Sequence, residues 1–133
     1  MQDQELHSHC PMHIEAFRSY CLAKAGATEG FPFDNDTLVF KVAGKMFALL
    51  SLDGPSSANL KCDPEYALEL REKHPESVLP GYHMNKKYWN TVNFDGRLSD
   101  AFLYELVDHS YQLVVDKLPK KTQVQLAEES ADK

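Results

Sequence analysis

Two β-prone runs separated by a glycine turn constrain the fold of this chain most. Residues 37–43, TLVFKVA, are rich in β-branched and aromatic side chains, and residues 46–52, MFALLSL, form a second run of the same kind. The Gly44-Lys45 pair between them is a two-residue loop that begins with glycine, which is typical of a type II′ turn. The pattern therefore predicts a hairpin, and with it an antiparallel sheet.

Helix signals lie on both sides of this hairpin. Apolar residues recur at helical spacing across residues 12–25, and Gly26 follows as a stop. Residues 63–65, DPE, combine an N-cap aspartate, a proline at the first helical position and an acid in the first turn. They predict a helix that runs to about Lys73. A last helix is expected across residues 99–118, with two apolar stripes.

Further short strands are expected at residues 57–62 and 88–94. The order then becomes α-β-β-β-α-β-α, a single-domain α+β sandwich in which helices pack on an antiparallel sheet. We expect this domain to occupy residues 12–119. A flexible arm at 1–11 and a polar, disordered tail at 120–133 are expected to flank it.

The charge and cysteine content narrow the classes of function. The formal net charge is −6, and Met1–His13 and Thr122–Lys133 each carry −2 of it, which leaves the domain close to neutral. Nucleic-acid-binding domains are usually strongly basic, so any anion site must be local. Three cysteines without a CxxC pair suit a reducing compartment. Without a signal-peptide pattern or a membrane span, we expect a cytoplasmic protein with no membrane partner.

The segment 80–92, PGYHMNKKYWNTV, has the composition of a binding surface. It combines cations, amides and flat rings, including the only tryptophan, and holds few aliphatic residues. If it is extended, side chains alternate between its two sides. His83, Asn85, Lys87 and Trp89 then share one side.

Three motifs together resemble the MmcQ/YjbR family of small bacterial proteins. They are TLVFKVAGKMFALL, NLKCDP and PGYHMNKKYWNTV, in this order and spacing. The resemblance implies a CyaY-like fold with a double-wing surface that is proposed to contact DNA. Carried onto this sequence, the motif positions of the family are Lys41, Lys45, Lys61, Asp63, His83, Asn85, Lys87, Trp89 and Asn90.

Each candidate site residue also has a structural interpretation. Lys41, Lys45, Lys61, Lys86 and Lys87 form a phosphate patch in one interpretation, with Trp89 or Tyr88 as a stacking plane. In the other, the lysines are solvated and the tryptophan packs in the core.

The residues that could support catalysis have similar alternatives. Asp63 is favoured as a helix cap over a catalytic role. Cys62 beside Lys61 has either a lowered pKa or the character of a small buried hydrophobe. His83 with Asp63 or Asn85 could act in acid–base chemistry, but the sequence holds no nucleophile motif, so an enzyme is not the favoured expectation.

The leading hypothesis is a DNA-binding module that uses a local surface, without cofactor or metal, as a monomer or weak dimer. Its candidate binding residues are Lys41, Lys45, Lys61, His83, Asn85, Lys86, Lys87, Trp89 and Asn90. The alternative is a pocket for an anionic small molecule, sensory or enzymatic, around His83, Asn85 and Trp89. A third hypothesis is an adaptor that pairs through an edge strand near residues 31–33. His7, His9, Cys10 and His13 are metal-capable, but without zinc-site spacing they predict no native metal site.

Overall fold

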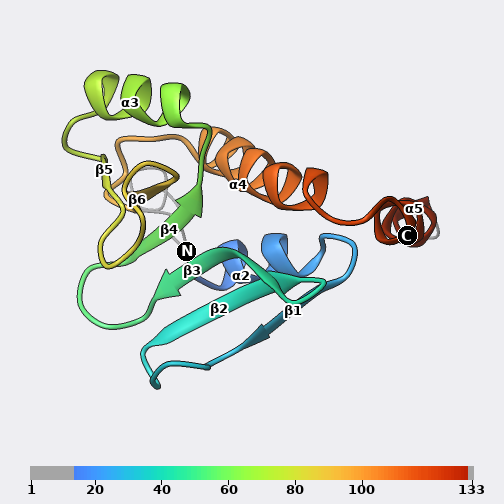
Figure 1. The fold of residues 1–133 in the computed structure, drawn as a ribbon. Coiled ribbons are helices and arrows are strands. Elements are labelled where there is room, and N and C mark those ends of the chain that lie inside the picture. Colours follow the sequence, from blue (N-terminus) through green and yellow to red (C-terminus); the bar gives the residue numbers. More distant parts are fainter. Residues whose placement is uncertain (1–13, 132–133) are drawn as a thin grey trace.

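The structure is a computed structural model that describes residues 14–131, and within this range it contains four helices and one six-stranded sheet (Figure 1). The helices are α2 (Ile14–Leu22), α3 (Pro64–Lys73), α4 (Asp100–Asp116) and α5 (Lys120–Ala131). The strands are β1 (Ala27–Gly30), β2 (Thr37–Val42), β3 (Lys45–Ser51), β4 (Ser57–Lys61), β5 (Val78–Pro80) and β6 (Trp89–Asn93).

All neighbouring strands run antiparallel, in the order β1-β2-β3-β4-β6-β5. The expected α+β sandwich with an antiparallel sheet is thus confirmed. The expected helices and four central strands are present, and β1 and β5 add an edge strand on each side. The arm expected at residues 1–11, with His7, His9 and Cys10, and the nearby His13 lie outside the described residues. None of the helices within residues 14–131 is long and apolar enough to cross a membrane.

The hairpin turn differs from the predicted type II′ loop. The loop residues are Ala43 and Gly44, and both have positive φ angles, 51° and 81°, which is the type I′ pattern. The reason is a bulge in β3. Phe40 pairs with Ala48 and Lys41 with Met46, so Phe47 is an extra residue, and both Phe47 and Ala48 are buried. The bulge moves the turn one residue toward the N-terminus.

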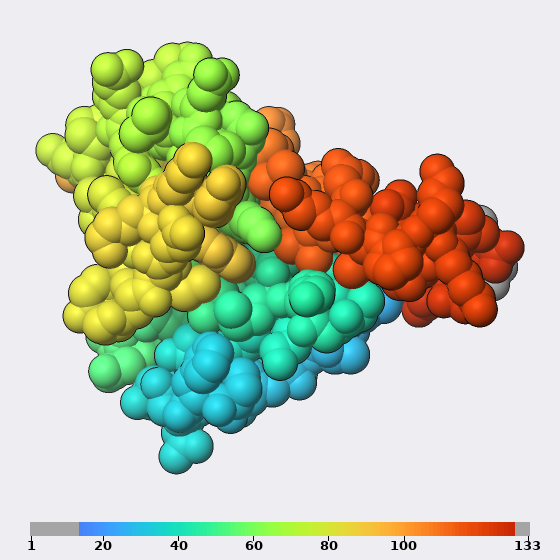
Figure 2. Space-filling view, viewed as in Figure 1, coloured from blue at the N-terminus to red at the C-terminus, as the bar shows by residue number. Residues whose placement is uncertain are grey.

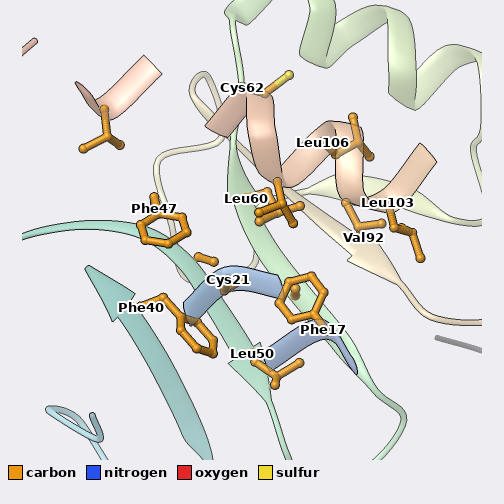
Figure 3. Close-up of a cluster of buried hydrophobic side chains, with 14 of the residues drawn as sticks. Phe17, Cys21, Phe40, Phe47, Leu50, Leu60, Cys62, Val92, Leu103 and Leu106 are labelled. Atoms are coloured by element: carbon orange, nitrogen blue, oxygen red, sulfur yellow. The ribbon is translucent and has the colours of Figure 1, made fainter. Parts of the chain in front are cut away.

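The main core lies between one face of the sheet and the helices. In Figure 1, α2 lies behind β2 and β3. Figure 3 shows Phe17 and Cys21 of α2 among the side chains that the strands and α4 contribute to this cluster. These core side chains include Phe17, Cys21, Phe40, Phe47, Leu50, Leu60, Val92, Leu103 and Leu106. Their alternation along the strands fixes which side chains face the opposite side of the sheet.

The C-terminal segment differs from the disordered tail that was expected at residues 120–133. Residues 120–131 form helix α5, not the disordered tail that their polar composition suggested. The helix gains a tertiary contact through Leu126, which is half-buried and packs against the main core. A Cβ placed on Gly26 would come within 2.5 Å of the Leu126 side chain, so the glycine leaves room for this contact. One apolar contact of this kind is easily missed in a polar sequence.

Candidate functional site

The sheet face opposite the helices is the candidate site, and we call it the open face. Strand alternation assigns its side chains. Three rows cross it: the pairs Lys41–Met46 and Lys61–Trp89 at one end; Val39, Leu49, Asn59, Thr91 and Leu79 in the middle; and Thr37, Ser51, Ser57 and Asn93 at the other end. We call the first of these the lysine row. Among the described helices, none contributes to the small apolar cluster on this face.

Trp89 forms part of the floor of the open face. Its side chain is only 8% exposed and packs with Val39 and Leu49, and Met46 and Met84 add further cover. The ring is therefore packed, as one interpretation expected, but in this small cluster and not in the main core. Its ring is not a free stacking plane, although it lies on the same face as the lysines and not in the main core.

The loop before β6 folds back over Trp89. The Gly81 amide donates to the Trp89 carbonyl oxygen at 2.9 Å, and a Cβ on Gly81 would lie 2.8 Å from the Trp89 Cβ. The amides of Tyr88 and Trp89 both donate to the Asn85 carbonyl oxygen. The Asn85 side-chain oxygen accepts from the Lys87 amide at 2.9 Å. Turns therefore replace the extended conformation considered for this segment, so the condition for the alternation from His83 to Trp89 is not met.

Asn90 faces the helices and is 2% exposed. Its side-chain oxygen accepts from Arg71 Nε at 2.7 Å, and its amide donates to the Ala67 carbonyl oxygen at 3.4 Å. The Arg71 guanidinium also donates to the carbonyl oxygens of Trp89, at 3.3 Å, and of Lys86. Arg71 thus fixes the loop and β6 to α3, a role that no motif in the sequence indicated. We leave Asn90 out of the proposed surface for this reason.

The structure separates the predicted lysine patch. Lys41 and Lys61 lie in one row of the open face and are half-buried. Lys45 is exposed and pairs with Val42, which points to the helix side. Lys86 donates to the Gly81 carbonyl oxygen at 3.3 Å, and the Lys87 ammonium lies 5.5 Å from the centre of the Tyr88 ring. Lys41 and Lys61 are therefore the pair that shares the open face.

A hollow of about 790 Å³ occupies the rest of the open face, next to the lysine row. In Figure 2, the yellow segment around residues 80–90 and the blue segment around residues 30–36 lie on either side of teal β3 on this face. Three loops and the strands beside them line it. Its lining residues are Phe33, Asp34, Asp36, Thr37, Leu49, Ser51, Asp53, Ser57, Asn59, Leu79, Pro80, Tyr82, His83, Met84 and Thr91.

The hollow has an acidic and aromatic character that sequence reasoning missed. Asp34, Asp36 and Asp53 line it, and no lysine does. Phe33 and Tyr82 are 64% and 69% exposed, and the Tyr82 ring centre lies 3.9 Å from that of His83.

Hydrogen bonds hold one wall of the hollow in place. The Thr91 hydroxyl donates to the Asn59 side-chain oxygen at 2.5 Å and accepts from the Tyr82 amide at 2.9 Å. Of the three residues around which a pocket was expected, His83 lines the hollow, whereas Asn85 and Trp89 do not.

Asp63 and Cys62, two of the residues considered for catalysis, have structural surroundings that explain them without it. The Asp63 carboxylate caps α3 by accepting from the amides of Glu65, at 3.2 Å, and Tyr66, at 3.3 Å. Asp63 does not line the hollow with His83. Burial raises the pKa of the Cys62 thiol to about 12, so the lowered pKa considered for it is wrong. No group of three or more His, Cys, Asp and Glu side chains in the described part of the chain could hold a metal ion.

Comparison with known proteins agrees with this architecture. The YjbR family model matches residues 22–113. The chain is 39% identical to the uncharacterized protein YjbR of Escherichia coli K12 over 111 residues, covering 83% of this chain and 93% of that protein. It is 45% identical to the uncharacterized protein YbdF of Escherichia coli O157:H7 over 94 residues, covering 70% of this chain and 76% of that protein.

Solved structures show the same likeness. A crystal structure of a Deinococcus radiodurans protein with the DUF419 domain superposes with a TM-score of 0.82 at 40% identity, covering 90% of each chain. A crystal structure from Pseudomonas syringae gives a TM-score of 0.64 at 28% identity, covering 77% of this chain and 98% of that one. The chain therefore belongs to the YjbR family.

Proposed function

We propose that this protein is a cytoplasmic, non-enzymatic binding protein that holds nucleic acid on the open face, with phosphates at the lysine row. The observation that carries the proposal is the position of Lys41 and Lys61. They come from β2 and β4, on either side of β3, and project from one row of a face that no described helix covers. Lysine ammonium groups supply the sequence-independent part of nucleic-acid affinity.

The charge distribution limits the size of this contact. The chain carries a net charge of −6, and the aspartates of the hollow lie on the same face as the lysines. Phosphates are attracted to one end of the face and repelled from the other. Each neutralised phosphate contributes about −0.7 to −0.9 to the slope of log K against log salt concentration. A contact of few phosphates gives weak binding at moderate salt, and tighter binding at low salt.

The test is fluorescence anisotropy with labelled random-sequence oligonucleotides over a range of salt concentrations. Lys41→Ala and Lys61→Ala should each reduce the magnitude of the salt slope by roughly one. The matched control is Lys73→Ala, at the exposed C-terminal end of α3, which should keep the wild-type slope. Absence of salt-dependent binding, or an equal effect of all three substitutions, would refute the proposal.

The hollow itself favours a second candidate, a small-molecule binding protein. Its three carboxylates oppose the anionic ligand that the sequence suggested, and they suit a ligand with amino groups. A ligand at about 100 times its dissociation constant stabilises a protein by about 2.7 kcal/mol. A thermal-shift screen of nucleotides, amines and common anions tests this candidate, and an unchanged melting temperature throughout would count against it.

A further inference from the structure

The open face has two ends of opposite charge, and this polarity indicates more than phosphate binding. We propose that the hollow seats an unpaired nucleobase of a single strand whose phosphate lies at the lysine row. The inference rests on the proposed function and adds the form of the nucleic acid and the class of base. Three features support it: the spacing of the two ends, the exposed aromatic walls and the free carboxylates.

The spacing of the two ends suits one nucleotide. Lys41 belongs to the lysine row, and Thr37, four residues earlier on β2, lines the hollow. At about 3.4 Å per residue, the two rows are separated by roughly 14 Å, and the middle row lies about 7 Å from the lysines. A nucleotide separates its phosphate from the far edge of its base by a comparable length. A phosphate at Lys41 or Lys61 therefore leaves its base over the hollow.

The walls of the hollow suit a flat, apolar ring. Phe33 and Tyr82 are among the most exposed large hydrophobic side chains of the described residues, and both line the hollow. Leu49 and Leu79 also line it and add apolar surface. Bases stack on such side chains when they are unpaired, whereas in a duplex their faces are already stacked and their edges paired. The hollow therefore favours a single strand over a duplex.

The carboxylates select among the bases. Asp34 already accepts hydrogen bonds from the amides of Asp36 and Thr37, whereas no hydrogen bond from a described residue reaches the carboxylate of Asp36 or Asp53. A carboxylate accepts and does not donate, so it favours base edges rich in N–H groups. Guanine offers two adjacent N–H donors on its Watson–Crick edge, cytosine and adenine offer one amino group, and thymine has an N–H between two carbonyl oxygens. We expect guanine to bind most tightly and thymine least.

The experiment compares three labelled ligands by anisotropy at low salt. They are a twelve-residue oligothymidine, the same strand with one central guanine, and the guanine strand annealed to its complement. The single strand with guanine should bind at least about five-fold more tightly than oligothymidine. This ratio is the lower end of the discrimination that one good base contact provides. The duplex should bind more weakly than both. Guanosine monophosphate as competitor should displace the strand only at concentrations far above the strand's dissociation constant.

Variants identify the residues responsible. Asp36→Asn and Asp53→Asn should reduce the guanine preference while the salt slope stays that of wild type. Tyr82→Ala should weaken both single strands equally. The control is Glu72→Gln, an exposed acid on α3, which should change none of these quantities. Circular dichroism of each variant is the check that it is folded. The aspartates are exposed, so Asp→Asn is a mild change.

The outcomes separate this inference from the proposed function. A salt slope that depends on Lys41 and Lys61, without preference for guanine or for a single strand, would refute the base site and keep the phosphate site. If the Asp→Asn variants raise the affinity equally for all sequences, the aspartates act only by repelling phosphates. That result would also refute the base site. Displacement by guanosine monophosphate at concentrations near the strand's dissociation constant would assign the hollow to a free nucleotide and overturn the strand proposal. Absence of any binding would overturn both proposals.

Discussion

At the scale of the residue, the side chains that marked a site in the sequence have two different roles. Trp89 and Asn90 are buried on opposite faces of β6, where one forms a floor and the other holds an arginine. Lys41 and Lys61 reach the open face. The same mixture of amides, rings and cations thus serves both folding and surface chemistry, and burial is what separates the two.

Asn90 offers a direct test of this division. Replacing it with alanine removes the acceptor of Arg71 Nε inside the structure, and hydrogen bonds to charged groups contribute about 1.5–3 kcal/mol. We expect Asn90→Ala to lower the free energy of unfolding in urea by about that amount. Asn93→Ala, which loses a more exposed bond to the Glu76 carbonyl oxygen, should cost less than about 1 kcal/mol. Equal costs would contradict the structural role given to Asn90.

His109 makes stability depend on pH. Its Nε2 accepts from the Asp63 amide at 3.2 Å, and burial lowers the pKa of the imidazole, against the opposing effect of the Asp63 charge. The unfolded chain, with a histidine pKa near 6.5, therefore takes up the proton first as the pH falls. Stability from the neutral imidazole is complete above about pH 6.5 and is lost below it. Urea unfolding from about pH 7.5 to 5 should show this loss in the wild type and a flatter profile in His109→Gln. Identical profiles would contradict the assignment.

At the scale of the element, sequence patterns predicted the parts whose signal is local. The cap at Asp63 and the helical stripes of α4 depend on neighbouring residues, and they are found where the patterns placed them. Strands β1 and β5 are short and gain their conformation from pairing at the edges of the sheet. Helix α5 depends on a contact with Gly26, which is distant in sequence. Such non-local stabilisation leaves little trace in a single sequence.

The close packing of the β5–β6 loop on Trp89 depends on Gly81. A Cβ there would lie 2.8 Å from the Trp89 Cβ and 2.9 Å from its carbonyl oxygen, and neither atom can move without displacing β6. Gly81→Ala should therefore reduce stability by about 1–3 kcal/mol, the usual cost of overpacking. Gly30→Ala is the matched control, because a Cβ there meets nothing within 4 Å. Thermal melts of the two variants compare them, and a stable Gly81→Ala protein would show that the loop is not tightly held.

Helix α5 should depend mainly on Leu126. This side chain is half-buried, so its truncation to alanine should cost about 1 kcal/mol, part of the 1.5–3 kcal/mol for a fully buried leucine. The amides of residues 120–131 should then exchange faster with deuterium, while those of β3 keep their protection. Val124→Ala removes an exposed side chain of the same helix and should leave exchange unchanged. Equal exchange in both variants would mean that α5 is held by other contacts.

At the scale of the whole molecule, the polarity of the open face could not be predicted. The lysine row depends on the bulge in β3, which sets the partner of Lys41. The hollow combines three loops, at residues 31–36, 52–56 and 81–88, that are distant in the sequence. The sequence showed cations and rings near one another in the 80–92 segment, but only the register of β2, β3, β4 and β6 brings aspartates and lysines onto one surface.

The strand order also has a consequence for how the chain folds. Strands β2 and β3 are joined by a two-residue turn, whereas β4 meets β6 only after residues 62–88 have closed into a loop. Loop closure costs entropy that grows with the logarithm of loop length, so we infer that the β4–β6 ladder forms after the β2–β3 hairpin. Thr91→Val, which breaks the bond to Asn59, should then mainly speed unfolding, whereas Val39→Ala should slow folding. Stopped-flow chevrons of the two variants measure this order. If the β4–β6 ladder forms last, the hollow is completed only in that step.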